Sequence, residues 1–163
     1  MDQDSAGRVE PPGEMMIKIY LDSNVFVEAY EKKSGDASEA ARAVLRMVDD
    51  GGALAVISEL VIAELLVKPF ANADQILFDI YSELFAPQIG YTTCPIDRSS
   101  LLEAARQRAI HSATKLPDAI HVATARLHGC TAFLTSDARL RMPPDLVRVK
   151  LSASTISDLQ ALA

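Results

Sequence analysis

Short runs of β-branched and aliphatic residues alternate with helical patterns along almost the whole chain, and this alternation constrains the fold most. Strands are predicted over residues 16–21, 54–57, 91–95, 131–134 and 147–151, with helical segments between them. A strand followed by a helix and then another strand requires a right-handed crossover, which makes the two strands parallel. The pattern therefore predicts an α/β three-layer sandwich, with a mainly parallel five-stranded sheet between helices.

Several of the predicted helices have recognisable ends or faces. Pro69 is expected to stop the helix over residues 59–67, because proline lacks the N–H that a helix interior needs. Asp97 is expected to cap a helix with an apolar stripe as its packing face. The helix over residues 118–128 is apolar nearly all round in its first half, which predicts burial. The stripe after Asp97 consists of Leu101, Leu102, Ala105 and Ala109, and the other predicted helices cover residues 23–31, 37–48, 74–85 and 156–162.

The N-terminal residues differ from the rest of the chain. Residues 1–15 mix acidic residues, Gly and a Pro-Pro pair without periodicity, so they are predicted to form a flexible tail. Residues 16–163 are predicted to form a single domain, because a length of 163 residues suggests one domain. The start of the chain has no apolar stretch typical of a signal peptide, and no later run approaches the roughly 18 apolar residues of a membrane helix. We therefore expect a cytoplasmic protein without a membrane segment.

Charge and cysteine content exclude two further classes of protein. Sixteen Lys and Arg against 22 Asp and Glu give a formal charge of −6, which disfavours nucleic-acid binding mainly through a basic surface. The balance is uneven, because residues 101–163 hold more basic than acidic side chains and leave room for a local basic surface. Cys94 and Cys130 have no metal-binding spacing and are predicted to be buried free thiols, so a zinc finger and a disulfide framework are excluded.

Four acidic residues lie at or near the places where a parallel α/β sheet gathers functional side chains. Asp22 and Asp137 directly follow the first and fourth predicted strands, and Asp118 lies in the first turn of the apolar helix. Asp22 and Asp118 also suit a purely structural role as helix caps or dipole partners. Glu64 lies mid-helix in an apolar run, too far from the N-terminus to act as a cap. Glu59, in the first turn of the same helix, fits a solvated position and is not expected in the site.

Converging carboxylates imply a bound cation. Two unit charges about 4 Å apart repel by roughly 4 kcal/mol at an effective dielectric constant of 20, so such groups must protonate, disperse or bind a cation. Oxygen ligands without Cys or a paired-His motif suit a hard ion such as Mg²⁺ or Mn²⁺. An ion held this way keeps open positions that polarise phosphate and orient an attacking water.

Three blocks of the sequence resemble a known family when their order and spacing are taken together. They are IYLDSNVFVEA, VISELVIAELLVKPF and KLPDAIHVATARLHGCTAFLTSD. They look like the successive blocks of a PIN-domain ribonuclease, in particular of the VapC-type toxins of bacterial and archaeal toxin-antitoxin pairs. The resemblance covers about residues 16–151, and its strongest part is LPDAIHVATA followed by FLTSD.

This resemblance implies an activity, a cofactor and a set of site residues. The activity would be metal-dependent endoribonuclease cleavage of RNA phosphodiester bonds, leaving a 5′-phosphate and a 3′-hydroxyl, with Mg²⁺ (or Mn²⁺) as the cofactor. The catalytic and metal-binding acids would be Asp22, Glu64, Asp118 and Asp137. Secondary positions, where the family often has small polar residues beside the acids, are Ser23, Asn24, Thr135 and Ser136.

The resemblance also implies partners: an RNA substrate, a cognate antitoxin and a second copy in a two-fold homodimer. The segment 60–85 holds more large apolar side chains than two short helices can turn toward one sheet, which predicts antitoxin docking there. A plainer explanation is that these side chains complete the core and a dimer contact. Basic residues in or beside the predicted loops around the acids could meet the RNA backbone, and the sequence leaves open which of them do so: Lys68, Lys115, Arg139 and Arg141.

Other interpretations of the same residues stay open to different degrees. His121, three residues from Asp118, is interpreted as a core histidine with a backbone partner rather than as a base or ligand. A haloacid dehalogenase-like phosphatase with Asp22 as nucleophile would need a second Asp at position 24, which is Asn. An RNA-processing PIN nuclease without an antitoxin and a non-catalytic binding module both stay open. An antitoxin gene immediately upstream would favour the toxin.

Overall fold

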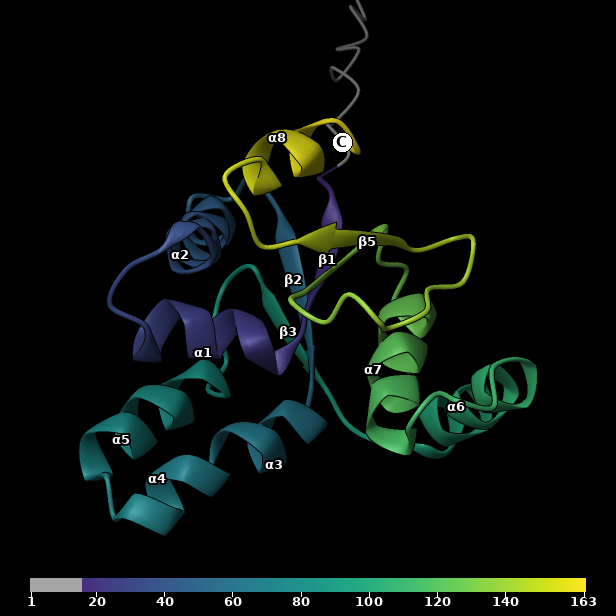
Figure 1. Ribbon diagram of the computed structural model, residues 1–163, viewed down its shortest axis with the longest axis horizontal. Coiled ribbons are helices and arrows are strands. Elements are labelled where there is room, and N and C mark those ends of the chain that lie inside the picture. The colour runs from purple at the N-terminus through teal and green to yellow at the C-terminus, as the bar shows by residue number, and fades with distance from the viewer. Residues whose placement is uncertain (1–15) are drawn as a thin grey trace, which may run out of the picture.

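The computed structural model describes residues 16–163 and contains one five-stranded sheet in the order β3-β2-β1-β4-β5 (Figure 1). All four pairings between neighbouring strands are parallel, which confirms the predicted α/β sandwich. The segment predicted to be a flexible tail, residues 1–15, lies outside the described residues. The strands are β1 (Lys18–Leu21), β2 (Leu54–Ser58), β3 (Tyr91–Cys94), β4 (Ala132–Thr135) and β5 (Val147–Lys150).

Helices cover both faces of this sheet. On one face lie α1, α2 and α8; on the other lies α7, with α6 packed against its outer side (Figure 1). The helices α3, α4 and α5 lie beyond the carboxyl end of β2, and buried residues of α3 and α5 belong to the same core as those of α1 and α2. The helices are α1 (Ser23–Glu31), α2 (Asp36–Asp49), α3 (Leu60–Leu65), α4 (Val67–Asn72), α5 (Gln75–Leu84), α6 (Arg98–Ile110), α7 (Leu116–Leu127) and α8 (Thr155–Gln160).

The central strand β1 divides the core in two, because successive side chains of a strand point to opposite faces. Ile19 and Leu21 join the core under α1 and α2, whereas Tyr20 joins the core under α7. The ring of Tyr20 stacks on that of Phe133 in β4, with centroids 4.7 Å apart. β1 is therefore buried on both faces, as expected for a parallel sheet covered by helices.

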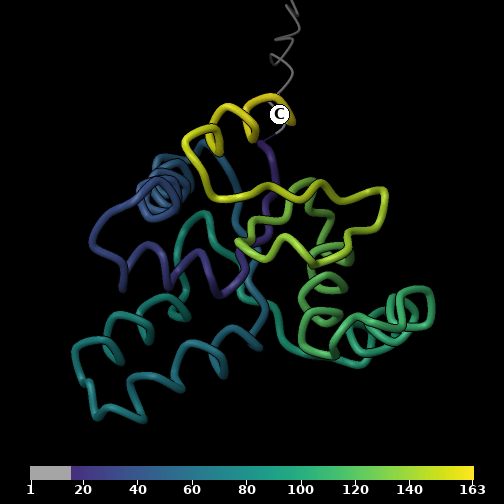
Figure 2. Tube along the Cα trace, in the orientation of Figure 1, coloured from purple at the N-terminus to yellow at the C-terminus, as the bar shows by residue number. Residues whose placement is uncertain are grey.

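The order of the strands fixes where a site can form. The chain leaves β1 into α1 on one face, and it leaves β4 into residues 136–146, which pack Leu140 and Leu146 on the other face. This segment between β4 and β5, green to yellow in Figure 2, contains no helix. A crevice therefore opens at the carboxyl ends of β1 and β4, where the connections diverge.

Two details of the helices differ from the predictions. Pro69 does not end the helical segment, because α4 runs through it. Pro69 occupies the first turn of α4, where its missing N–H has no helical partner to lose. The apolar stripe predicted to be the packing face of α6 is exposed instead, including Leu101 and Leu102. The face of α6 that packs on α7 combines Ala104 with polar side chains, among them Glu103, which forms an ion pair with Arg126 of α7.

Two simpler expectations agree with the structure. Residues 119–125 of α7 are buried, in agreement with the burial predicted from the apolar sequence of this helix. Cys94 and Cys130 are buried free thiols, and burial raises the pKa of Cys130 to about 12. Within residues 16–163 there is no helix with the length and apolar character needed to span a bilayer.

Candidate functional site

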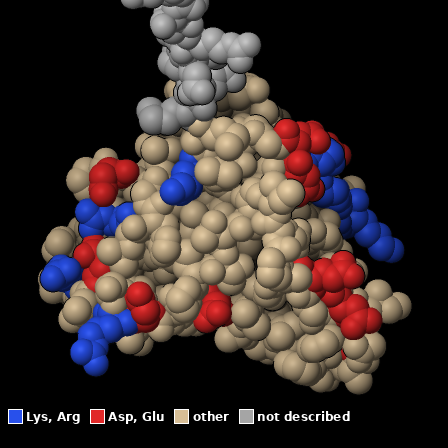
Figure 3. Space-filling view, turned by 180° about the vertical axis from the view of Figure 1, so that it is seen from behind, with Lys and Arg blue, Asp and Glu red and all other residues tan. Residues whose placement is uncertain are grey.

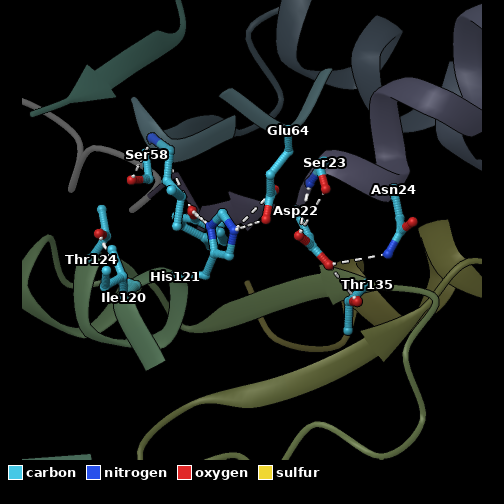
Figure 4. A network of polar contacts seen from close by, with 11 residues as sticks. Asp22, Ser23, Asn24, Ser58, Glu64, Ile120, His121, Thr124 and Thr135 are labelled. Atoms are coloured by element: carbon cyan, nitrogen blue, oxygen red, sulfur yellow. Dashed lines mark hydrogen bonds and ion pairs between the residues drawn. The ribbon is translucent and has the colours of Figure 1, made fainter. Parts of the chain in front are cut away.

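Asp22, the first of the four predicted acids, is held by hydrogen bonds to both of its carboxylate oxygens. It follows β1 at the N-terminus of α1, and its Oδ1 accepts a hydrogen bond of 2.8 Å from the backbone N–H of Ser23. Its Oδ2 accepts a hydrogen bond of 2.7 Å from the hydroxyl of Thr135, at the end of β4 (Figure 4). The Asp22 carboxylate is buried. It caps α1 and also lies in the crevice.

Glu64 reaches the crevice from α3, and its partner is the side chain of His121. Both carboxylate oxygens lie near His121 Nε2, at 3.2 Å and 3.1 Å. The Glu64 side chain is one-third exposed, whereas the imidazole is buried on α7. His121 Nδ1 lies 2.6 Å from the hydroxyl of Tyr20. The expectation of a backbone partner for His121 was therefore wrong: both ring nitrogens contact side chains.

Asp22, Glu64 and His121 form a group that could hold a metal ion. One potential ligand atom from each lies within 4.8 Å of the other two. These residues come from the end of β1, from α3 and from α7, which are brought together only by the fold. The two carboxylates suit a hard cation, and Asp22 keeps its geometry through Thr135, so the donor set fits Mg²⁺ or Mn²⁺.

Asp118 and Asp137 lie in an adjoining hollow rather than in this group. Both acids line it together with Lys115, Arg139 and Arg141. The Asp137 carboxylate turns into its own loop, where Oδ1 accepts hydrogen bonds from the Arg139 backbone at 2.8 Å and from its guanidinium at 3.3 Å. The four predicted acids thus divide into a tight pair, Asp22 and Glu64, and two neighbours on the basic side of the crevice.

The environment shifts the pKa values of these acids in different directions. Burial, opposed by His121 but reinforced by the nearby charges of Asp22 and Asp137, raises the pKa of Asp118. For Glu64, partial burial favours the neutral form, but the hydrogen bond and charge of His121, together with a smaller contribution from Ser23, outweigh burial and lower the pKa. Hydrogen bonds from the Arg139 backbone and side chain lower the pKa of Asp137. Of these three acids, Asp118 is the one whose pKa the environment raises.

The predicted secondary residues contribute unequally. Thr135 connects two acids, because its hydroxyl donates to Asp22 and accepts from the backbone N–H of Asp137 at 3.1 Å. Asn24 lies 3.4 Å from Asp22 Oδ2, and the Ser23 hydroxyl lies 3.5 Å from Oδ1, so both are weak partners. Ser136 is exposed and forms no side-chain hydrogen bond with the described part of the chain.

Sequence reasoning missed Tyr20, and it named Lys68 among the residues that could meet the RNA backbone. Tyr20 is fully buried beneath the crevice. Its signal was a phenol in an otherwise aliphatic strand, since a buried tyrosine hydroxyl needs a partner. Lys68 forms an ion pair with Glu31 on α1 rather than facing the acids. Glu59, which was not expected in the site, is exposed at the start of α3 and belongs to no group of potential metal ligands in residues 16–163.

Comparisons with known proteins agree with this architecture. The family model described as "PIN domain" matches residues 19–145. No curated protein sequence matches the chain.

Solved structures of low sequence identity share the fold. A toxin-antitoxin complex from Klebsiella pneumoniae has 18% identity and a TM-score of 0.59, covering 79% of this chain and 95% of that one. VapBC2 from Rickettsia felis, bound to a DNA fragment from its promoter, has 15% identity and a TM-score of 0.63, covering 82% and 98%. FitAcB from Neisseria gonorrhoeae has 21% identity and a TM-score of 0.60, covering 80% and 95%.

Proposed function

The chain belongs to the PIN domain family, a family of nucleases, and on this premise we propose that it is a metal-dependent endoribonuclease acting as the toxin of a toxin-antitoxin pair. The observation that carries the proposal is the convergence of Asp22 and Glu64 from separate elements at the crevice of the sheet. Two carboxylates so close together favour a divalent cation between them, because the ion removes their mutual repulsion.

Mg²⁺ or Mn²⁺ is the proposed cofactor, held by Asp22 and Glu64 with Asp118 and Asp137 at the rim. When bound, the ion would polarise the scissile phosphate and lower the pKa of an attacking water. Asp118 is suited to accept the proton from that water, because burial and the nearby charges of Asp22 and Asp137 raise its pKa. Thr135 would hold Asp22 in place.

The RNA backbone is proposed to enter on the side of the basic residues. Lys115, Arg139 and Arg141 line the hollow next to Asp118 and Asp137, and a second hollow continues along Arg139 and Arg141 toward Arg148. Within residues 16–163, Lys115 and Arg141 form no ion pair, so their charges are free to bind phosphate. Arg148 has another task, because its guanidinium donates to the carbonyls of Ala138 and Leu140 and holds the loop.

The antitoxin is proposed to dock across α3, α4 and α5, the segment 60–85. Val67, Phe70 and Ile76 expose 65%, 68% and 77% of their surface, which is unusual for side chains of this size. In Figure 3, where α4 and α5 lie at lower right, this region shows acidic and uncharged side chains, and Lys68, the basic residue of segment 60–85, is paired with Glu31. A basic, amphipathic antitoxin segment would complement it, and the similar toxin-antitoxin complexes support such a partner.

A two-fold homodimer is also proposed. The outward face of α6 offers Leu101 and Leu102, which the fold leaves without a partner in the described part of the chain. This face lies on the opposite side of the crevice from α4 and α5 (Figure 1), so a second copy and an antitoxin need not compete.

Incubation of the full chain with total cellular RNA tests the nuclease directly. Cleavage should require Mg²⁺ or Mn²⁺, stop with chelator, and leave 5′-phosphate ends when the products are mapped. Asp22→Asn should remove cleavage, whereas Glu59→Gln, an exposed acid on the same side of the molecule, should leave it unchanged. Chelator-resistant cleavage, or equal losses with Glu59→Gln and Glu64→Gln, would refute the proposed mechanism.

A further inference from the structure

A series of hydrogen bonds leads from the interior of the sheet to Glu64. The backbone N–H of Ser58, at the end of β2, donates to the Tyr20 hydroxyl at 3.3 Å. The same hydroxyl lies 2.6 Å from His121 Nδ1, and His121 Nε2 lies 3.1 Å from Glu64 (Figure 4). Four elements, β2, β1, α7 and α3, thus contribute one member each.

The chemistry of the members sets the direction of every bond. A backbone N–H can only donate, so the Tyr20 oxygen accepts from Ser58. The single proton of the fully buried Tyr20 hydroxyl then has one acceptor among the described residues, His121 Nδ1. With Nδ1 as acceptor, the proton of the neutral imidazole sits on Nε2 and is donated to the Glu64 carboxylate.

This assignment decides between two roles for His121. Its proximity to Asp22 and Glu64 makes it a candidate metal ligand. A ligand nitrogen must offer a lone pair, but Nε2 carries the proton that binds Glu64. We propose that Tyr20 and His121 are positioning residues, which hold Glu64 in the metal site, and that His121 is not itself a ligand. The metal-binding part of this inference rests on the proposed function; the direction of the hydrogen bonds does not.

Glu64 needs such a partner more than Asp22 does. A glutamate side chain has high rotamer freedom, and ordering it is among the larger entropic costs for any residue. Glu64 stands on the six-residue helix α3 with a third of its side chain exposed, so solvent competes for it. In the structure its hydrogen bonds within the described chain go to His121.

A role in packing alone is the competing explanation. Tyr20 stacks on Phe133, and His121 is buried, so removal of either whole side chain would disturb the core. Tyr20→Phe avoids this problem, because it keeps the ring and removes only the hydroxyl. His121→Gln keeps an N–H donor for Glu64, whereas His121→Leu does not. A matched control is Tyr81→Phe. The hydroxyl of the buried Tyr81 donates a hydrogen bond of 2.5 Å to the carboxylate of Glu31, and this variant removes only that hydroxyl.

The first experiment uses the metal-free full chain. Nitrogen-15 NMR of labelled histidines should show His121 protonated at Nε2 and unprotonated at Nδ1, and Tyr20→Phe should perturb the Nδ1 signal. The same variant should leave the signals of the half-buried His111 and the exposed His128 unchanged. A ring protonated at Nδ1 would overturn the assignment, whatever the activity of the protein.

The second experiment measures Mn²⁺ affinity by calorimetry and ligand identity by pulsed electron paramagnetic resonance. Loss of a supporting partner typically weakens metal binding about 10- to 100-fold, and we expect this for His121→Leu. His121→Gln should recover part of the affinity, Tyr20→Phe should show a smaller loss, and Tyr81→Phe should match the wild type. Wild-type affinity in His121→Leu, or coupling of bound Mn²⁺ to an imidazole nitrogen, would refute the positioning role. If the wild type bound no Mn²⁺, the proposed nuclease would fail, while the NMR result would still decide the hydrogen-bond directions.

Discussion

Replacing Arg141 with Gln should weaken RNA binding by the loss of one phosphate contact. Each contact to single-stranded nucleic acid contributes about 0.7 to the slope of log affinity against log salt concentration. Arg141 and Lys115 have no carboxylate partner in the described chain, whereas Arg139 pairs with Asp137 and has part of its charge neutralised. We therefore expect the slope to fall by about 0.7 for Arg141→Gln or Lys115→Gln, by about 1.4 for both together, and by less for Arg139→Gln.

Fluorescence anisotropy with a labelled RNA oligonucleotide measures this slope. All proteins would carry Asp22→Asn to prevent cleavage, and affinity would be followed from about 50 to 200 mM salt. Over this range, a slope change of about 0.7 alters the ratio of the affinity at low salt to the affinity at high salt by about 2.6-fold. Arg46→Gln on α2 changes the net charge equally but lies on the opposite face of the sheet. Equal slopes for Arg46→Gln and Arg141→Gln, or an unchanged slope in the double variant, would refute the proposed path of the RNA.

Three further predictions concern the acids, the antitoxin and the dimer. Asp118→Asn should abolish cleavage yet raise the melting temperature near pH 7. The folded-state pKa of Asp118 is raised, so its charge destabilises the fold at pH values above that pKa, and the variant removes this charge. The gain in melting temperature, measured in a calorimetric scan, should therefore vanish as the pH falls below the usual pKa range of Asp. A gain that persisted in acid would contradict this origin. Phe70→Lys or Ile76→Asp should abolish inhibition by the cognate antitoxin in a cleavage assay while sparing cleavage itself, and full inhibition of both variants would exclude the α4–α5 surface. Leu101→Lys with Leu102→Lys should convert the dimer to a monomer in sedimentation at micromolar concentration, and a wild-type monomer under those conditions would disprove the dimer.

The layers and the parallel pairing follow from local patterns, because short β-branched or aliphatic runs alternate with helical segments and each crossover has one permitted hand. The order of the strands in the sheet, β3-β2-β1-β4-β5, was not predicted from these patterns. The orientation of α6 was not predictable in this way, because its apolar stripe is real but faces outward. Its packing face depends on Glu103 meeting Arg126 of the next helix, a contact that helical periodicity does not reveal.

The same limit applies to the candidate site. Asp22 and Glu64 stood out because of their positions beside a strand end and within an apolar run. The role of His121 depends on Tyr20, which lies 101 residues earlier in the chain and meets it only through the sheet. The separation of Asp137 from the tight pair depends on its contact with Arg139, which only the loop conformation reveals.

The hydroxyl of Thr135 joins the ends of β1 and β4 by donating to Asp22 and accepting from the Asp137 backbone. Only serine can replace threonine in both bonds, since valine has the same shape but neither donates nor accepts. Its neighbour Ser136 is exposed and makes no such contact in the described chain. In a saturation mutagenesis screen for toxicity, these two adjacent hydroxyl residues should therefore behave differently. Position 135 should tolerate only a residue with a hydroxyl, whereas position 136 should tolerate almost any side chain.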